Sequence, residues 1–96
     1  MQGATVVEQT ALKQFTKDGL VPTRWSNAPH AVYGVHDHPY GKTLVVVEGG
    51  ITFVVESTGR RVTMKPGDRL DLPPRTPHSA VVGPEGVVCL EGHLPR

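Results

Sequence analysis

The sequence predicts an all-β fold, either a sandwich or a barrel, with one short helix near the N-terminus. From Leu20 onward, Pro and Gly recur every eight to twelve residues, and the segments between them are rich in Val, Ile, Thr, Phe and Leu. This alternation of short apolar segments with turn residues is typical of β-sandwiches and β-barrels. In two of the segments, apolar and polar side chains also alternate one by one, as in strands that bury a single face.

Residues 1–22 are expected to form an extension in front of the barrel, which would span residues 23–93 of a single domain. Thr5-Val6-Val7 could form a short first strand, and Thr10 is expected to cap the N-terminus of a helix. Gly19 would end this helix. Its apolar face would consist of Ala11, Leu12 and Phe15. A single short helix of this kind is expected to pack on the outside of a sheet.

Strands are predicted between the turn signals. They cover residues 23–26, 31–38, 43–48, 52–56, 61–64, 69–72, 78–82 and 87–91. Gly49-Gly50 is predicted to form a tight hairpin, and Pro84-Glu85-Gly86 is predicted to form another reversal. Pro66-Gly67 fits the centre of a type II turn, in which proline sets φ and glycine adopts a positive φ.

Strand parity assigns side chains to the two faces of the sheet. Ile51, Phe53 and Val55 occupy alternate positions of one segment and are expected to face the core. In contrast, residues 44–47 are apolar on both faces and need cover on both. A second sheet would cover one face, and the helix or a second subunit would cover the other. Exposed apolar strand faces also favour a homodimer.

The composition fits one domain of 96 residues and argues against two classes of partner. Ten Lys and Arg residues balance nine Asp and Glu residues without forming a basic stripe, so nucleic-acid binding has no electrostatic support. Cys89 is the only cysteine, which excludes an intramolecular disulfide and favours a reducing compartment. The N-terminus lacks the features of a secretory signal, and no apolar stretch is long enough to span a bilayer. We therefore expect a cytoplasmic protein that does not bind a membrane.

His36, His38 and His78 are the candidate metal ligands. On a strand, His36 and His38 would point to the same face, with Cα atoms roughly 6.5–7 Å apart. Two imidazoles at that spacing can converge on one metal ion, because zinc–nitrogen bonds are about 2.0–2.1 Å long. His78, in a later strand, offers a third ligand. Three neutral imidazoles would leave at least one coordination position open, as in catalytic metal sites.

Two stretches around these histidines resemble the two sequence motifs of the cupin family. His36-x-His38-x3-Lys42-x6-Gly49 resembles the first motif, and Gly67-x5-Pro73-x-Arg75-x2-His78 resembles the second. The segment between them has the short length typical of small single-domain cupins, and the resemblance covers residues 34–82. It implies a jelly-roll β-barrel that holds one divalent metal, with His36, His38 and His78 at the positions of metal-binding histidines.

The sequence departs from the family at the position of its usual fourth ligand, a glutamate. Lys42 stands there, and a register shifted by one residue would place Thr43 there instead. Lys42 is expected to extend to the barrel mouth with its charge in water. In the alternative, it points inward and binds an anionic substrate or acts as a base. Imidazole ligands suit Zn, Cu, Fe and Ni, whereas Mn is less favoured without the glutamate.

Five residues are expected to line a pocket beside the metal, namely Lys42, Tyr40, Phe53, Val55 and Gly34. Tyr33 has the opposite strand parity to His36 and is expected to pack outside the barrel. Trp25 is expected in the core or at a subunit contact. His30 and His93 are interpreted as surface residues.

An apolar pocket with a few polar groups suits a small organic molecule. One hypothesis is a metal-dependent enzyme of the oxygenase or isomerase type acting on such a molecule. Another is a non-enzymatic module that binds or senses a small ligand or a metal. A third is a metal-free structural dimer. Whether the protein is an enzyme stays open on the sequence alone, because proteins that resemble this one by fold and ligands catalyse several reactions.

Overall fold

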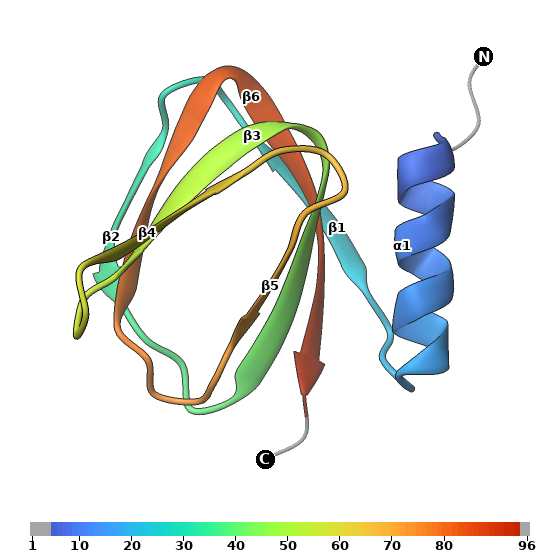
Figure 1. Ribbon diagram of the computed structural model, residues 1–96, viewed down its shortest axis with the longest axis horizontal. Helices are drawn as coiled ribbons and strands as arrows, with labels where there is room; N and C mark the ends of the chain where they lie inside the picture. Colours follow the sequence, from blue (N-terminus) through green and yellow to red (C-terminus); the bar gives the residue numbers. More distant parts are fainter. Residues whose placement is uncertain (1–4, 95–96) are drawn as a thin grey trace.

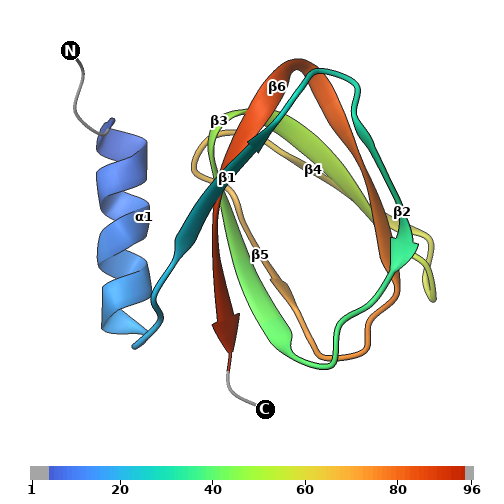
Figure 2. The same cartoon turned by 180° about the vertical axis from the view of Figure 1, so that it is seen from behind.

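The computed structural model describes residues 5–94, which form one helix and six strands (Figure 1). In chain order, these are α1 (Val6–Lys17), β1 (Thr23–Asn27), β2 (Val32–His36), β3 (Gly41–Val55), β4 (Arg60–Met64), β5 (Arg69–Leu72) and β6 (His78–Leu94). The predicted fold class is confirmed. The strands curl into a barrel, and α1 lies outside the barrel beside β1 (Figures 1 and 2).

Two long antiparallel strands, β3 and β6, form the frame of the barrel. They pair along almost their whole length, from Gly41 opposite Leu94 to Val55 opposite His78. The shorter strands add to this pair, since β1 and β2 pair with β6 whereas β4 and β5 pair with β3. Each long strand therefore carries one short partner on each of its two halves.

The predicted hairpin at Gly49-Gly50 and the predicted reversal at Pro84-Glu85-Gly86 are wrong, because both segments lie inside continuous strands. At Gly49 (φ 71°) and Gly86 (φ 78°), the backbone adopts a left-handed conformation, and β3 pairs with β6 on both sides of this region, at Gly49–Val87 and again at Ile51–Val82. Register shifts on both sides of Gly49 mark β-bulges, which bend a strand locally. The two glycine-containing segments are therefore bends within long strands.

The turn predicted at Pro66-Gly67 is present and links β4 to β5. Gly67 adopts φ 94°, and the Asp68 N–H donates to the Lys65 carbonyl at 2.9 Å across the turn. A positive φ at the third residue, with this hydrogen bond, is the geometry expected of a type II turn.

Helix α1 begins at a different residue from the one predicted. Thr5 caps the helix, and the Glu8 N–H donates to the Thr5 hydroxyl at 3.1 Å. The predicted strand at residues 5–7 is therefore wrong, and Thr10 lies within the helix rather than at its cap. The sequence carries a signal for this start, since threonine followed three residues later by glutamate has the capping-box spacing.

The C-terminal end of α1 lies where it was predicted. Gly19 adopts φ 74°, and the Leu20 N–H donates to the Phe15 carbonyl at 2.8 Å, as in a Schellman motif. The buried face contains Ala11 and Phe15, whereas Leu12 is 37% exposed and lies outside it. Among residues 5–94, no helix has the length and apolar character needed to cross a membrane.

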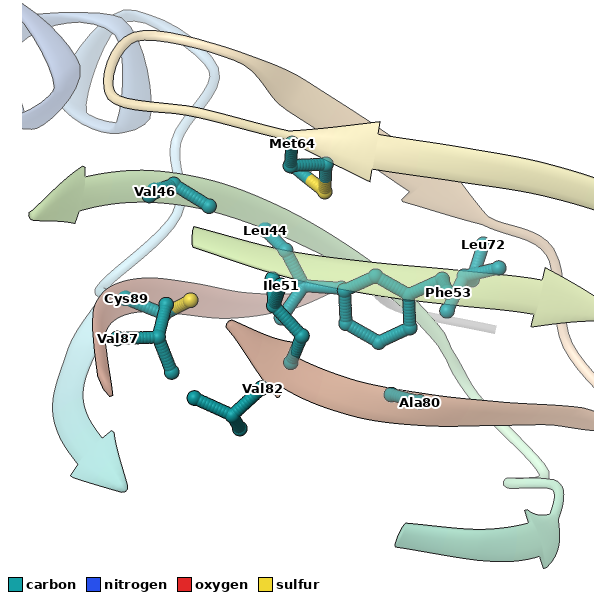
Figure 3. Packing of buried hydrophobic residues seen from close by; sticks show 10 residues of the cluster. All are labelled: Leu44, Val46, Ile51, Phe53, Met64, Leu72, Ala80, Val82, Val87 and Cys89. Carbon is teal, nitrogen blue, oxygen red and sulfur yellow. The ribbon is translucent and has the colours of Figure 1, made fainter. Parts of the chain in front are cut away.

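The apolar run at residues 44–47 is buried on both faces, as predicted. Leu44 and Val46 join the inner cluster of the barrel (Figure 3), whereas Val45 and Val47 pack with residues of α1. The outer cover is therefore the helix of the same chain. The inner cluster consists of Leu44, Val46, Ile51, Phe53, Met64, Leu72, Ala80, Val82, Val87 and Cys89.

Cys89 behaves as an apolar core residue. It is fully buried in the inner cluster and forms no disulfide. Burial, reinforced by the nearby Glu91 carboxylate, raises the pKa of the Cys89 thiol to about 12. The thiol is therefore neutral at pH 7 and a poor nucleophile.

Three valines are exposed on β2 and β6, namely Val32, Val35 and Val81. Val32 and Val81 are direct partners across the two strands, so they form one apolar patch. Small patches of this kind are common on monomers as well as at interfaces. The homodimer therefore stays a prediction.

Candidate metal centre

Three histidines from two distant parts of the chain meet in the barrel. His36 ends β2, His38 follows in the connection to β3, and His78 begins β6. One nitrogen of each imidazole lies within 4.8 Å of the corresponding nitrogens of the other two. The ring centroid of His36 is 4.4 Å from that of His78 and 5.0 Å from that of His38. The structure therefore brings the three predicted ligands together.

The geometry that joins His36 to His38 differs from the predicted one. Strand β2 ends at His36, so His38 is not a strand residue and the i, i+2 strand argument does not apply. His36 is placed by its direct pairing with His78 on β6, the strand beside which β2 lies in Figure 2. The connection that carries His38 is anchored where the Arg75 N–H donates to the His38 carbonyl at 2.6 Å.

A β-bulge in β2 reverses the facing predicted for Tyr33. Tyr33 pairs with Ala80 and His36 pairs with His78, so three steps along β2 match two steps along β6. The extra residue brings Tyr33 to the same side as His36, although the two differ in sequence parity. Tyr33 therefore lines the cavity instead of packing outside the barrel. Trp25, which was expected in the core or at a subunit contact, lines the cavity as well.

Backbone carbonyl groups fix the orientation of two of the imidazoles. His36 Nδ1 lies 2.7 Å from the Gly34 oxygen, and His78 Nδ1 lies 2.8 Å from the Thr76 oxygen. A carbonyl oxygen only accepts hydrogen bonds, so each Nδ1 carries the proton and each Nε2 keeps a free lone pair. Metal-binding histidines commonly use their second nitrogen in this way, because the hydrogen bond holds the ring in place.

His78 Nε2 is a buried polar atom without a partner. His78 is 2% exposed, and among residues 5–94 its Nε2 has no hydrogen-bond partner. An unpaired buried polar atom costs roughly 1–3 kcal/mol and is therefore rare in folded proteins. A divalent transition metal fits this donor set, because the imidazole nitrogen suits zinc, copper, iron and nickel.

His38 lies between an aromatic ring and a buried ammonium group. The Tyr40 ring stacks on it with centroids 5.1 Å apart, and the Tyr40 hydroxyl is 3.3 Å from His38 Nδ1. Lys42 Nζ donates to His38 Nε2 at 3.4 Å. Burial, followed by the charge of Lys42, lowers the pKa of His38 below its ordinary value of 6.5. His38 is therefore neutral at pH 7, which is the form that binds metal.

Lys42 points into the cavity, so the prediction that it extends to the barrel mouth is wrong. Its side chain is only 10% exposed, and its Nζ lies 3.6 Å from Glu91 Oε1. The register of β3 explains this direction, because Lys42 shares a face with the buried Leu44, whose direct partner on β6 is Glu91. Thr43 points to the opposite face and donates a hydrogen bond to Asp71 at 2.9 Å.

Glu91 is a cavity residue that was not among the predicted ones. Its carboxylate accepts hydrogen bonds from Trp25 Nε1 at 3.1 Å and from His93 Nε2 at 2.7 Å. The alternation of β6 carries a signal for its position. Val87 and Cys89 belong to the inner cluster, and residue 91 follows them on the same face.

The three histidines, Lys42 and Glu91 form the polar part of a cavity of about 310 Å³. The other lining residues are mainly apolar and consist of Trp25, Ser26, Tyr33, Leu44, Ile51, Phe53 and Ala80. Small-molecule sites typically have this composition, and the volume lies near the lower end of their range. The cavity therefore suits a small ligand that combines an apolar body with a polar group.

Two of the five predicted pocket residues, Lys42 and Phe53, line the cavity. Tyr40 lies beside the cavity and stacks on one of the three imidazoles. Gly34 and Val55 do not line it. Gly34 is exposed on β2, where the bulge changes the facing of the strand, and Val55 packs against the inner cluster at the end of β3.

The two remaining histidines are not part of the cluster. His30 is exposed and adopts φ 65° before the start of β2. His93 is exposed near the end of β6, where its ring stacks on Tyr40 with centroids 4.2 Å apart. Both therefore lie at the surface, as predicted.

We expect the metal-free protein to lose stability as the pH falls below 6.5. Burial, more than any nearby charge, lowers the pKa of both His38 and His78 in the folded state. Between pH 6.5 and these lowered values, the unfolded chain binds protons that the folded chain does not, so acidification favours unfolding. Urea denaturation from about pH 7.5 to about pH 5.5 would measure this loss.

Two variants test the source of that pH dependence. His78→Gln removes one buried imidazole and should weaken the pH dependence of the free energy of unfolding. His30→Gln removes an exposed imidazole and should leave it unchanged. The same pH dependence in the wild type and in His78→Gln would contradict the role given to burial.

Comparison with known proteins identifies a related domain. A family model described as "Cupin domain" matches residues 23–93, which is most of the chain. The comparison with curated proteins gave no significant match. The family match thus includes β1 to β5 and all of β6 except Leu94, and it leaves α1 outside.

Several solved structures share the fold. The structure of KdgF from Halomonas sp. has a TM-score of 0.66 and 26% identity, covering 80% of this chain and 70% of that chain. An RmlC-like cupin from Shewanella frigidimarina NCIMB 400 has a TM-score of 0.68 and 27% identity, covering 80% and 67%. A structure described under the DMSP lyases RdDddP and RnDddQII has a TM-score of 0.72 and 22% identity, covering 79% of this chain. The present chain spans only 38% of that lyase chain.

Proposed function

Because the chain belongs to the cupin family, we propose that it holds one divalent transition metal in its barrel and binds a small organic molecule beside that metal. The proposed ligands are His36, His38 and His78. The metal would be Zn, Ni, Fe, Cu or Mn, of which the first four suit an all-imidazole donor set best.

The observation that carries this proposal is the state of His78. Its Nδ1 is held by a backbone carbonyl, whereas its Nε2 is buried and has no hydrogen-bond partner among residues 5–94. Its ring centroid lies 4.4 Å from that of His36 and 5.7 Å from that of His38. Each of the three imidazoles places one nitrogen within 4.8 Å of those of the other two. Because the proton of His78 is on Nδ1, its Nε2 offers an electron pair and cannot donate a hydrogen bond to the other rings. A cation that accepts lone pairs would satisfy all three at once.

The cavity would bind the small organic molecule beside the metal. When bound, a metal with an open position would polarise an oxygen atom of a small ligand as a Lewis acid. The apolar wall that includes Trp25, Phe53 and Ile51 would hold the body of the ligand and exclude water. The carbonyl groups of Gly34 and Thr76 would keep two of the imidazoles oriented.

Metal titration of stripped protein tests the proposal. We expect chelator-treated wild-type protein to bind one equivalent of Zn²⁺ or Ni²⁺ by calorimetry. His78→Ala and His36→Ala should each weaken this binding by at least about 100-fold, because losing a ligand costs more than the 10- to 100-fold loss typical of a supporting residue.

A matched histidine control is present in the chain. His30→Ala removes a surface imidazole outside the cluster and should bind metal as the wild type does. Thermal melts of all variants would show that each is folded. A His78→Ala protein that keeps full metal content would overturn the proposal.

A non-enzymatic binding module of the same fold is the second candidate. The observation that favours it is the pairing of Lys42 with Glu91, the two charged side chains of the cavity wall. Each partly neutralises the other, so neither stands free as a general base. Oxygen consumption by metal-loaded protein with phenolic and diketone compounds would support an enzyme, whereas saturable binding of such compounds without turnover would support the module.

A further inference from the structure

We infer that Lys42 makes the cavity selective for small molecules with one carboxylate group, and that Glu91 is the internal counter-ion with which such a ligand competes. This inference rests on the proposed function in that it concerns the same cavity. It can be tested apart from the metal, because it is argued from the positions of Lys42 and Glu91 in the cavity wall.

The ammonium group of Lys42 is buried but poorly satisfied. Its side chain is 10% exposed, so water replaces few of the hydrogen bonds it lost on folding. Its distance of 3.6 Å from Glu91 Oε1 is too long for a hydrogen bond, and charge-assisted bonds normally measure about 2.7–2.9 Å. Within the described part of the chain, its one hydrogen-bond acceptor is His38 Nε2, at 3.4 Å. An ammonium group has three N–H donors, so Lys42 has capacity for an incoming anion.

Glu91 is fixed by other groups and does not depend on Lys42. Trp25 Nε1 donates to its Oε1 at 3.1 Å, and His93 Nε2 donates to its Oε2 at 2.7 Å. These two bonds hold the carboxylate back at the wall, whereas Lys42 has a flexible four-carbon stem. Glu91 therefore lowers the cost of burying the ammonium without occupying its donors.

The charge balance of the site also favours an anion. Three neutral imidazoles carry no charge, and Lys42 and Glu91 cancel each other. A bound dication would therefore leave two positive charges in a wall that is otherwise apolar. If the metal takes the His38 Nε2 lone pair, Lys42 also loses its hydrogen-bond acceptor. A ligand carboxylate would supply both a negative charge and a new acceptor.

The remaining wall defines the rest of the ligand. Trp25, Tyr33 and Phe53 present aromatic surface, and Ile51 and Leu44 present aliphatic surface. A cavity of about 310 Å³ with this wall excludes large or strongly polar molecules. The ligand class is therefore a small monocarboxylate with an apolar body.

Benzoate and benzamide are suitable probes, because they share one shape and differ in charge. In metal-free protein with chelator present, we expect benzoate to bind at least about 10-fold more tightly than benzamide by calorimetry or by chemical-shift titration. Butyrate and butyramide should show the same preference. Equal affinities within each pair, or no binding of either carboxylate at 10 mM, would overturn the inference.

Variants of the two charged residues should act in opposite directions. Lys42→Gln should reduce benzoate affinity roughly 10- to 100-fold and leave benzamide unchanged, whereas Lys42→Arg should retain the preference. Glu91→Gln should raise benzoate affinity, because the amide oxygen can still accept from Trp25 but no longer offsets the ammonium charge. A Glu91→Gln protein that binds benzoate more weakly would contradict the competition.

Surface controls separate this effect from net charge. Lys13→Gln and Glu85→Gln make the same charge changes at exposed positions and should bind benzoate as the wild type does.

The outcome of metal titration is independent of the outcome of the benzoate test. If metal binding fails while the benzoate preference persists, the carboxylate site stands without the metal. If metal binds and the preference is absent, only the present inference fails.

Discussion

Replacing Gly49 with alanine is expected to destabilise the protein by at least about 3 kcal/mol. A Cβ atom at this position would lie 1.9 Å from the Gly86 carbonyl oxygen, so the backbone of β3 or β6 would have to move. The residue also adopts φ 71°, which costs an L-residue roughly 1–2 kcal/mol by itself. Urea denaturation would show the loss as a lower transition midpoint.

Gly59→Ala is the matched control for this prediction. Gly59 adopts nearly the same conformation, with φ 69°, but an added Cβ would have no atom within 4 Å. Alanine at this position should therefore cost only the conformational term, roughly 1–2 kcal/mol. If the two substitutions destabilise the protein equally, the close contact between Gly49 and Gly86 is not what holds the bend.

Replacing Lys42 with glutamate is expected to raise the affinity for divalent metal by at least about 100-fold. The substitution removes a positive charge whose Nζ lies 3.4 Å from a nitrogen of the proposed ligand His38, and it adds a carboxylate there. Two unit charges about 4 Å apart interact by about 4 kcal/mol at an effective dielectric constant of 20, which is larger than the 2.7 kcal/mol that a 100-fold change needs. Calorimetric titration of stripped protein with Zn²⁺ measures the change.

A second readout accompanies the gain in affinity. In the metal-free protein, the introduced carboxylate would lie near Glu91 without a cation between them, so the melting temperature should fall. Added metal should then raise the melting temperature of Lys42→Glu by more than it raises that of the wild type. Lys42→Gln separates the removal of repulsion from the gain of a ligand, and Lys13→Glu controls for net charge. Wild-type metal affinity in Lys42→Glu would show that residue 42 does not act on the site.

Local sequence signals were sufficient for the fold class and for the identity of the three histidines. Turn residues, alternating apolar segments and two motifs pointed to a barrel with His36, His38 and His78 close together, and the structure brings them together. The apolar run at residues 44–47 also indicated cover on two faces, which the inner cluster and α1 provide.

The features that escaped prediction depend on pairing between distant segments. Gly49-Gly50 has the local composition of a hairpin, but pairing of β3 with β6 on both sides makes it a bend. The side of the sheet on which Tyr33 lies is set by a bulge in β2 against β6. Such a bulge cannot be predicted from the spacing of residues in the sequence. Lys42 points inward because it occupies the same face of β3 as the buried Leu44, which pairs directly with Glu91 on β6.

The pairing of β3 with β6 has a consequence for the kinetics of folding. The two strands join residues far apart in the chain, so loop-closure entropy must be overcome before most native contacts form. His36 and His78 meet only after β2 has docked on β6. A metal held by them would therefore stabilise an arrangement completed late in folding. It would slow unfolding and leave the folding rate nearly unchanged.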